Sequence, residues 1–490
     1  MNLLQRVFMN VSFKSLGEVG RKVIGFGFVI FLARTLGDKG LGKYGFLLLY
    51  TNLFAMVADA GLNTLYARES AKEPQSRQQT MSALLLIKLI LSAVTAILVA
   101  SVTYVLIAAG KIDLSSADLL PLALFALYWI LNTMIDLVNA VYIERQRLAY
   151  DAAINLGHRA LAVVLGVVLV LVFRNVLAVS ASYVIAAVVS LVATCFVVAS
   201  RFKIRPWPSL RTGRVRHLLL EALPLIFSLF FSFVYFHIDV VMLRMFTNEA
   251  VVGWYVASFK ILEFTMLLPG AAAMVVLPLF AKQFVRDREQ LVVISGQLVR
   301  ILFGAGLFVA FVLTTLAGRI IPIFGKDFGP QSQLALQILV WTIPLIYVDY
   351  VLIYLLVASS HQRKNAIAAF FCAMLNISLN YALIPSYSYK GAAAATVVTQ
   401  VLLMMLSAHF VRKPLPSFRM CKYILRVAAA GAFAGAALWL ARGLGSELQC
   451  VVTLAVFAIC LLLFKGVTKE DKELLSQLLA RGNASRQTIS

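Results

Sequence analysis

The chain has 490 residues, of which 61% are hydrophobic and only 13% are charged. Soluble proteins are about 45–50% apolar and about 25% charged, so these values exclude both a soluble fold of this length and an intrinsically disordered chain. The 44 Lys and Arg residues outnumber the 22 Asp and Glu residues. They stand between apolar runs rather than in one patch, which argues against a nucleic-acid partner and is typical of the basic loops of a membrane protein.

Fourteen apolar segments are long enough to cross a membrane as helices, because a span takes about 20 residues. They are too long, and alternate too little between apolar and polar residues, to be strands of a transmembrane barrel. We therefore expect an all-α polytopic membrane protein. In chain order the segments are residues 14–33, 43–66, 81–109, 119–143, 152–173, 176–200, 218–246, 250–280, 291–317, 333–358, 364–384, 390–411, 422–441 and 447–465.

A weak internal repeat links the second segment to the eighth. The sequence LGKYGFLLLYTNLF, which begins at Leu41, resembles VGWYVASFKILEFT at an offset of 211 residues, so that Gly42 matches Gly253 and Tyr44 matches Tyr255. Each motif follows a short turn that carries an acidic residue. The repeat pairs helices 1–6 with helices 7–12, and parallel repeats of this kind place a substrate path between two lobes.

The repeat predicts two pseudo-symmetric lobes of six helices each, followed by two extra helices. Leucines at helical spacing near the C-terminus predict a further helix on the membrane surface. The expected parts are an N-lobe at 1–200, a basic cytoplasmic loop at 201–217, a C-lobe at 218–411, helices 13 and 14 at 412–465, and a cytoplasmic tail at 466–490.

The distribution of basic residues between the spans predicts the orientation. The connections on the side of the N-terminus hold 27 Lys and Arg residues, and those on the opposite side hold 10. Since Lys and Arg concentrate in cytoplasmic loops, we expect the N-terminus and the C-terminus to lie in the cytoplasm.

Charged residues inside the spans are the candidates for function, because a charge at the bilayer centre costs at least about 2.5–3.5 kcal/mol. Glu18, Arg21 and Lys22 are spaced to share one helical face, and Lys260 is three residues before Glu263. The cations would bind an anionic head group, Arg through its planar fork and Lys as a point charge. The alternative is internal pairing, of Glu18 with Lys22 and of Glu263 with Lys260.

Further embedded charges extend both groups of candidates. Lys88 is a fourth candidate for a cationic cavity, although its stem could also reach the membrane surface, as could those of Arg159 and Arg300. His237 and Asp239 form a candidate proton relay, since histidine titrates near neutrality. The acids that could bind a coupling ion, Na⁺ or H⁺, or only balance the cations are Asp59, Asp136, Asp239 and Asp349.

The sequence has none of the motifs that would indicate catalysis. It contains no G-x-x-x-x-G-K-[ST] phosphate loop, no H-E-x-x-H and no G-x-S-x-G, and its five cysteines form no C-x-x-C. We therefore expect no enzyme, no direct use of ATP, and no cofactor or metal apart from the coupling ion.

Four features of the sequence occur together. They are the stretch ARTLGDKGLGKYGFLLLYTNLFAMVADAGL at residues 33–62, the triplet Ala67-Arg68-Glu69, the fourteen spans arranged as twelve plus two, and the basic loop between the sixth and seventh spans. In these features the chain resembles the Wzx-type polysaccharide flippases of the multidrug/oligosaccharidyl-lipid/polysaccharide exporter superfamily.

The resemblance implies a flippase of the inner membrane that works by alternating access, with ion coupling. It would move a polyprenyl-diphosphate-linked oligosaccharide to the outer leaflet for cell-surface polysaccharides such as O-antigen. Its partners would be this glycan lipid, membrane lipid and the glycan polymerase machinery. Members line a central cavity with basic residues, some of them in helix 1, and Arg21 and Lys22 match these by location. This chain departs from the pattern because embedded acids balance its embedded bases.

Two other functions remain open at this point. A multidrug extruder, a cation antiporter of the same superfamily, would use acids such as Asp59 and Asp239 to bind an organic cation. A membrane glycosyltransferase or polymerase should have a large outer loop with paired acids or arginines, and the outer loops of this chain are short.

Overall fold

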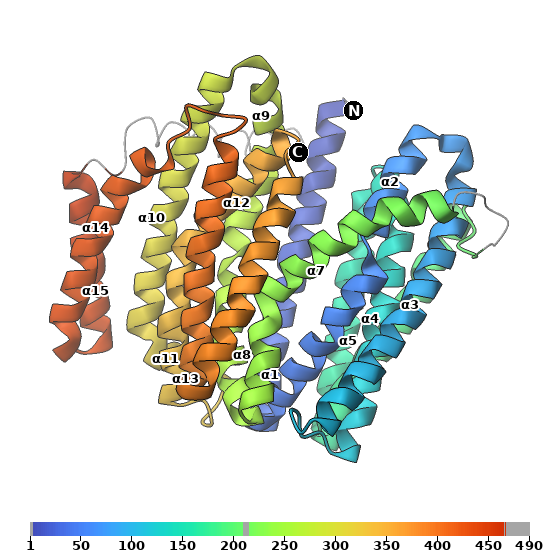
Figure 1. Cartoon of the computed structure of the whole chain (residues 1–490), viewed down its shortest axis with the longest axis horizontal. Helices are drawn as coiled ribbons and strands as arrows, with labels where there is room; N and C mark the ends of the chain where they lie inside the picture. Colours follow the sequence, from blue (N-terminus) through green and yellow to red (C-terminus); the bar gives the residue numbers. More distant parts are fainter. Residues whose placement is uncertain (1–2, 209–214, 465, 467–490) are drawn as a thin grey trace, which may run out of the picture. The chain divides into compact units, whose positions relative to one another are not determined.

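The computed structural model describes residues 3–208, 215–464 and 466, and every regular element in these residues is a helix, as expected. Residues 209–214 of the basic loop lie outside the described residues, as does the expected tail apart from Gly466. The elements are α1 (Leu3–Asp59), α2 (Leu62–Lys72), η1 (Pro74–Ser76), α3 (Arg77–Ala108), α4 (Ser116–Glu144), α5 (Leu148–Phe173), α6 (Val176–Arg201), α7 (Val215–Phe246), α8 (Glu249–Thr265), α9 (Leu267–Arg286), α10 (Arg288–Ile320), η2 (Ile321–Phe324), α11 (Pro330–Leu339), η3 (Val340–Thr342), α12 (Ile343–Ala358), α13 (Arg363–Val411), α14 (Met420–Leu440), η4 (Ala441–Gly443) and α15 (Ser446–Leu463) (Figure 1).

The protein is a multi-pass membrane protein. Within the described residues, 12 helical stretches are long and apolar enough to cross a membrane. Two of the helices are far longer than one crossing needs, since α1 has 57 residues and α13 has 49. Each contains one residue with non-helical backbone angles, Gly37 in α1 and Ser388 in α13. Dividing both helices at these residues gives fourteen spans, in agreement with the hydropathy of the sequence.

The first two spans form one long helix, α1, which is kinked at Gly37. Gly37 has a φ of 70°, in the left-handed region that glycine adopts without a steric penalty. The membrane-spanning stretch of this helix begins at Leu16, close to the predicted residue 14, and α1 itself extends back to Leu3. The predicted end of the second span was wrong, because α1 ends at Asp59 rather than at residue 66 and the short helix α2 follows.

The sequence marks Pro269-Gly270, inside the expected eighth span, as a hinge or unwound point, and the structure interrupts the span next to it. α8 ends at Thr265 and α9 begins at Leu267, shortly before Pro269. A proline has no N–H to offer the carbonyl four residues earlier, which here is the carbonyl of Thr265. The hydroxyl of Tyr347 in α12 donates to this carbonyl at 2.8 Å. A side chain therefore satisfies the acceptor that the proline leaves open.

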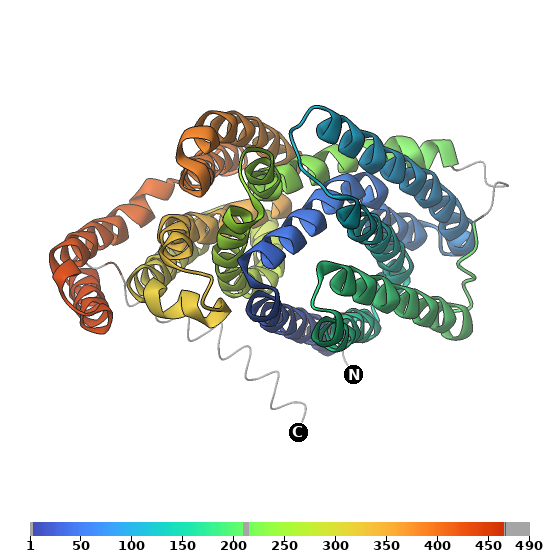
Figure 2. The same ribbon diagram turned by 90° about the horizontal axis from the view of Figure 1, so that it is seen from below.

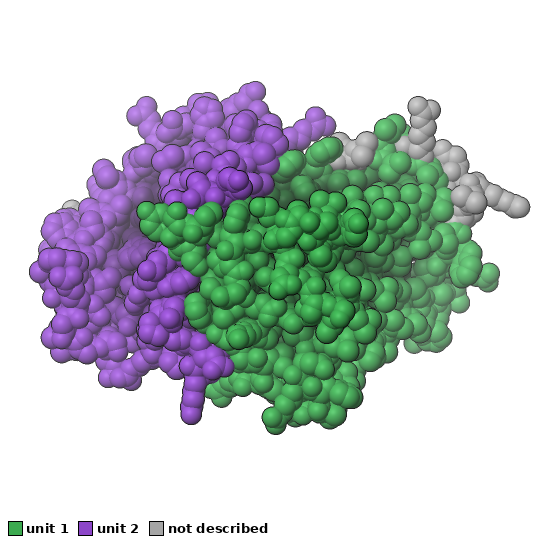
Figure 3. Space-filling view, turned by 60° about the horizontal axis from the view of Figure 1, so that its bottom comes forward, with its two compact units in different colours: residues 1–256, 384–388 green, residues 257–383, 389–490 purple. Residues whose placement is uncertain are grey.

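The helices group into two compact units, drawn in different colours in Figure 3. Unit 1 comprises residues 1–256 with residues 384–388, and unit 2 comprises residues 257–383 with residues 389–490. The lobe boundaries that the repeat predicts remain a prediction.

Unit 1 is a helix bundle in which α1 packs against α5, and α4 packs against α6 (Figure 2). One apolar core lies where α2, α3, α4 and α6 meet, and it includes Tyr66, Leu84, Tyr142 and Val198. Burial of such side chains stabilises the bundle while outward-facing positions stay apolar for lipid. In unit 2, α10 packs against α12, α14 and α15, and α14 and α15 form a helical hairpin.

Candidate functional site

The basic face of α1 lies in unit 1, before the kink at Gly37. Arg21 is about 24 Å from Gly37 along the helix axis, and it stands five residues after Leu16, where the first membrane-spanning stretch begins. Its side chain is 47% exposed, and its Nη2 donates to Glu18 Oε2 at 2.6 Å. Glu18 thus pairs with Arg21, and Lys22 is also exposed. This face of α1 still offers positive charge to a ligand.

Lys88 in α3 is completely enclosed by protein. Its Nζ donates to the backbone carbonyl of Asp59 at 3.1 Å and lies 3.8 Å from Asp59 Oδ1. α1 ends at Asp59, and the last carbonyls of a helix have no partner within it. The ammonium group therefore caps α1 and complements the negative end of its dipole. The predicted contact of Lys88 with a ligand stays a prediction.

Asp136 in α4 lies near other charged side chains inside unit 1, and we call this group of Asp59, Lys88, Asp136 and Arg21 the charged layer. It lies within electrostatic range of Asp59, Lys88 and Arg21, and it accepts a hydrogen bond from Asn132 Nδ2 at 3.2 Å. Carboxylates in this layer offset the ammonium and guanidinium groups beside them. α1, α3 and α4 therefore meet in a polar interior, which the balance of embedded acids and bases in the sequence anticipates.

Arg159 in α5 is a residue whose place the sequence left open. It does not extend to the membrane surface, because its Nη1 donates to the hydroxyl of Tyr183 in α6 at 2.9 Å. That hydroxyl lies 2.9 Å from the hydroxyl of Tyr44, and the ring of Tyr128 packs edge-on against Tyr183 with centroids 4.8 Å apart. Gly25 in α1 makes this position possible, because a Cβ there would lie 2.7 Å from Arg159 Nη2. The glycine was the feature of the sequence that could have indicated the contact. A single sequence does not show that these helices are neighbours.

The two members of the candidate proton relay contact different neighbours. Asp239 in α7 is 2% exposed; it accepts a hydrogen bond from the hydroxyl of Tyr255 in α8 and another from the backbone N–H of Val240. The ring of His237 packs at a tilt against that of Phe233, with ring centroids 4.6 Å apart. The relay itself stays a prediction.

The remaining candidates lie in unit 2. Lys260 Nζ is 2.6 Å from Glu263 Oε2, so the internal pairing that their spacing allows is formed. Asp349 in α12 is 3% exposed, and within the part of the chain that the structure describes its Oδ1 has no hydrogen-bond partner. In that same part, no group of three or more His, Cys, Asp and Glu side chains could hold a metal ion.

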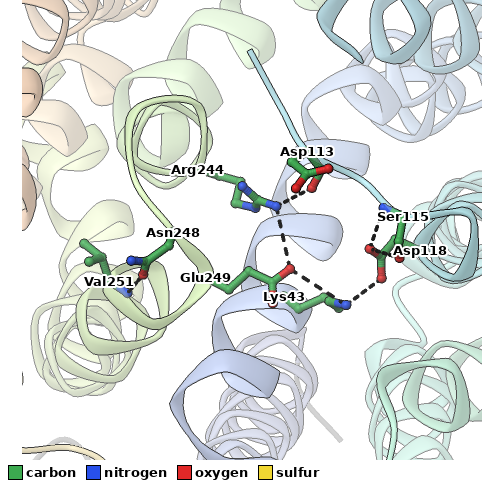
Figure 4. Close-up of polar contacts among 8 residues, drawn as sticks. All are labelled: Lys43, Asp113, Ser115, Asp118, Arg244, Asn248, Glu249 and Val251. Carbon is green, nitrogen blue, oxygen red and sulfur yellow. Dashed lines mark hydrogen bonds and ion pairs between the residues drawn. The ribbon is translucent and has the colours of Figure 1, made fainter. Parts of the chain in front are cut away.

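A second polar region of unit 1 lies where α1, the connection between α3 and α4, and the turn between α7 and α8 meet (Figure 4). Lys43 Nζ is 2.6 Å from Asp118 Oδ1 and 3.8 Å from Glu249 Oε1. Arg244 Nη2 is 3.7 Å from Glu249 and donates to the backbone carbonyl of Asp113. Both cations of this network are therefore met by carboxylates.

Next to this network, residues 38–45 of α1 and residues 249–256 of α8 form what we call the α1–α8 corner. A Cβ on Gly42 would overlap the carbonyl oxygen of Glu249, and a Cβ on Gly253 would overlap the carbonyl oxygen of Asp38. Each glycine thus packs against the backbone four residues before the other glycine. Only glycine permits so close an approach of two backbones.

The side chains of the α1–α8 corner also make reciprocal contacts. Lys43, next to Gly42, pairs with Glu249, and Trp254, next to Gly253, donates from Nε1 to Asp38 Oδ2 at 3.0 Å. At the offset of 211 residues, Lys43 corresponds to Trp254 and Asp38 corresponds to Glu249. Each of the two contacts therefore has an equivalent between the corresponding residues of the other repeat, as a pseudo-two-fold axis between the two repeats would produce.

Comparisons of the sequence with known families give two matches. The profile of the polysaccharide biosynthesis protein family matches residues 7–284, and the profile of the MatE family matches residues 224–382. A search of curated proteins finds no match.

Solved structures similar to the chain include a lipid II flippase, MurJ, in an inward closed conformation, with a TM-score of 0.72 and 14% identity over 92% of this chain and 98% of that one. A multidrug resistance MATE family transporter of the MOP superfamily, in an inward-facing conformation, has a TM-score of 0.65 and 15% identity over 81% and 96%. A MOP superfamily transporter from Pyrococcus furiosus has a TM-score of 0.62 and 12% identity over 84% and 96%. At these identities the likeness establishes the fold.

Proposed function

The chain belongs to the family of polysaccharide biosynthesis proteins within the MOP superfamily of transporters, and from this premise we propose that it is a flippase for a polyprenyl-diphosphate-linked oligosaccharide. It would carry this lipid from the cytoplasmic to the outer leaflet of the inner membrane, with both of its termini in the cytoplasm. Glycan polymerase machinery would use the product.

One observation carries the proposal. Arg21 and Lys22 lie in the membrane-spanning stretch of α1, toward its N-terminal end, and both side chains are exposed in the protein. A charged side chain in contact with lipid is costly, so we expect these residues to face water or a ligand. A diphosphate head group has the complementary charge, and a guanidinium fork matches the geometry of its oxygens.

The competing function is multidrug extrusion by cation antiport. It would require acids that are free to bind an organic cation, and the two acids that the sequence offers for this role in unit 1, Asp59 and Asp239, have partners of their own. Asp59 lies beside Lys88, and Asp239 accepts the hydroxyl of Tyr255. These contacts favour an anionic substrate.

The test is the double variant Arg21→Ala/Lys22→Ala in a strain that lacks its own polysaccharide flippase and produces the matching glycan lipid. We expect surface glycan to fall at least about tenfold, the effect of losing one charged contact, while protein levels in the membrane stay normal. The matched control is Lys111→Ala/Arg174→Asn, which removes two exposed basic residues from connections between helices. Asn suits position 174 because the backbone there is left-handed.

Two outcomes would contradict the proposal. Normal glycan export by the double variant would remove the role of the α1 face. Failure of the wild-type protein to restore export, together with efflux of cationic dyes from the same cells, would establish the multidrug function instead.

A further inference from the structure

A groove of about 810 Å³ lies in unit 2 and is lined by residues of α10, α11, α13 and the α14–α15 hairpin. α14 packs against α10 and α15, so the groove lies beside these contacts, on the side of α13. The lining helices all belong to stretches that are apolar enough to cross a membrane. The large apolar side chains of the wall are Leu334, Ile338, Trp341, Val397, Val398 and Leu438.

One lining residue is a glycine of α14, Gly435. A Cβ on Gly435 would meet no described atom within 4 Å. One turn earlier in the same helix, a Cβ on Gly431 would lie 2.9 Å from a side-chain carbon of Leu307 in α10. The packing of α14 is therefore tight at Gly431 and leaves free space at Gly435.

The polar side chains of the groove wall are bonded to the protein. Thr314 donates its hydroxyl to the carbonyl of Ala310 at 2.7 Å, and Gln337 donates from Nε2 to the carbonyl of Thr314 at 3.1 Å. Gln449 of α15 donates from Nε2 to the carbonyl of Leu438, near the end of α14, at 3.0 Å. Water occupies cavities that offer it polar partners, and this wall uses its amide donors internally. Hydrocarbon is the filling that such a surface favours inside a membrane.

The groove carries a positive charge at one end. Arg442 lies in η4, at the end of the stretch Met420–Gly443, and its guanidinium group is 4.5 Å from the centre of the Trp439 ring. Among the described residues, no carboxylate lies within ion-pair distance of Arg442, since Glu447 at the start of α15 pairs with Arg319 at 2.6 Å. Trp and Arg at the end of a span are typical of the level of the lipid head groups, where a guanidinium group binds phosphate oxygens.

We propose that this groove binds a glycerophospholipid of the surrounding membrane, with an acyl chain between α13 and α14 and its phosphate next to Arg442. A phospholipid combines the apolar chain that the wall favours with the negative charge that the mouth favours. It is also the bulk component of a bilayer, so mass action favours it over a scarce lipid. The bound lipid fills the gap beside the α14–α15 hairpin and joins this hairpin to α13.

This site is separate from the proposed substrate site. Its lining residues all belong to unit 2, whereas the basic face of α1 belongs to unit 1. The phospholipid site therefore does not depend on which substrate the protein transports.

The experiment measures which lipids stay bound to the full-length protein. The protein is reconstituted in nanodiscs of equal parts phosphatidylglycerol and phosphatidylcholine, released into mild detergent and analysed by native mass spectrometry. We expect a retained phospholipid, enriched about threefold in phosphatidylglycerol, as one exposed charge pair would produce. Gly435→Phe fills the groove and should lower retention at least about tenfold, because fewer CH₂ groups of the lipid are buried. Arg442→Gln should retain lipid without the preference for phosphatidylglycerol.

Two matched variants control for side effects of these changes. Ala436→Phe adds the same side chain at the next position of α14, which is exposed and does not line the groove. Lys326→Gln removes an exposed charge from the connection after η2. Both proteins should retain phospholipid as the wild type does.

Several outcomes would contradict the phospholipid site. A wild-type protein that retains no phospholipid would overturn it, as would a Gly435→Phe protein that retains as much as the wild type. Equal retention of the two phospholipids would overturn the role of Arg442. Replacement of the phospholipid by an equal amount of undecaprenyl diphosphate would assign the groove to a prenyl chain and overturn the phospholipid as its occupant. Should Gly435→Phe fail to fold, Val398→Trp decides, because it narrows the groove from α13 at an exposed position: reduced retention supports the site, and unchanged retention overturns it.

Discussion

The α1–α8 corner with its adjoining network and the surroundings of Arg159 belong to the same unit and differ in the groups that lie next to the positive charge. In the network, Lys43 and Arg244 both have carboxylates within 4 Å. Arg159 instead donates to a neutral hydroxyl, that of Tyr183, which lies 2.9 Å from the hydroxyl of Tyr44. The network therefore joins its helices through ion pairs, whereas tyrosines hold the guanidinium group of Arg159.

The largest expected effect is the loss of a cation that is paired. Lys88→Met removes the ammonium group from the end of α1 and leaves Asp59 without its neighbouring positive charge. Breaking a buried pair by deleting one partner costs about 3–5 kcal/mol. We expect a matching loss of stability against thermal or denaturant unfolding of the purified protein.

Two further variants check the cause of that loss. Lys88→Met/Asp59→Asn should recover part of the stability, because it also removes the unpaired carboxylate. Lys111→Met, at an exposed position, should change little. A stable Lys88→Met protein would mean that this interior layer does not depend on charge pairing, and the contrast with Arg159 would lose its basis.

A smaller effect is expected from the glycines of the α1–α8 corner. Gly42→Ala places a methyl group where the carbonyl oxygen of Glu249 lies, so α1 and α8 must move apart. Such overpacking costs about 1–3 kcal/mol. Gly253→Ala should have a similar effect, because its contact with Asp38 is the counterpart. Melting temperatures of the purified variants measure this.

The control for the corner is Gly27→Ala. Gly27 lies in the same helix as Gly42, but a Cβ there would meet nothing within 4 Å. It should be neutral or slightly stabilising, since alanine favours helices by about 1 kcal/mol over glycine. If Gly42→Ala and Gly253→Ala behaved like Gly27→Ala, the reciprocal contact would have no energetic weight.

The sequence predicted the parts of the fold that follow from local chemistry. Hydropathy identified the spans, and Pro269 indicated the interruption between α8 and α9. The end of α1 at Asp59 was not predicted, although Gly61, which is left-handed like Ala60 before it, was an available signal for the end of a helix. The repeat marked Gly42 and Gly253 as equivalent, but not as facing each other's backbone.

The candidate site was predictable only in part, because the contacts that define it join different helices. Charge and depth marked Arg21, Lys22 and Lys88 as candidates. The partners that distinguish them are distant in the chain: Lys88 binds a backbone carbonyl of α1, and Arg159 fits against Gly25. Spacing along a helix reveals neighbours on that helix, such as Lys260 and Glu263. Contacts between helices depend on packing that a single sequence does not encode visibly.

The smallest expected effect on stability is that of Arg159→Gln, and it separates the two regions most sharply. Removal of this guanidinium breaks one hydrogen bond, to Tyr183, and leaves no carboxylate unpaired. A hydrogen bond between neutral and charged partners contributes only about 0.5–3 kcal/mol, and Tyr183 keeps its bond to Tyr44. In the absence of lipid substrate we therefore expect Arg159→Gln to melt close to the wild type and well above Lys88→Met. A loss as large as that of Lys88→Met would make Arg159 a structural residue, because only a charge whose partners lie within the protein stabilises the fold by that amount before any ligand binds.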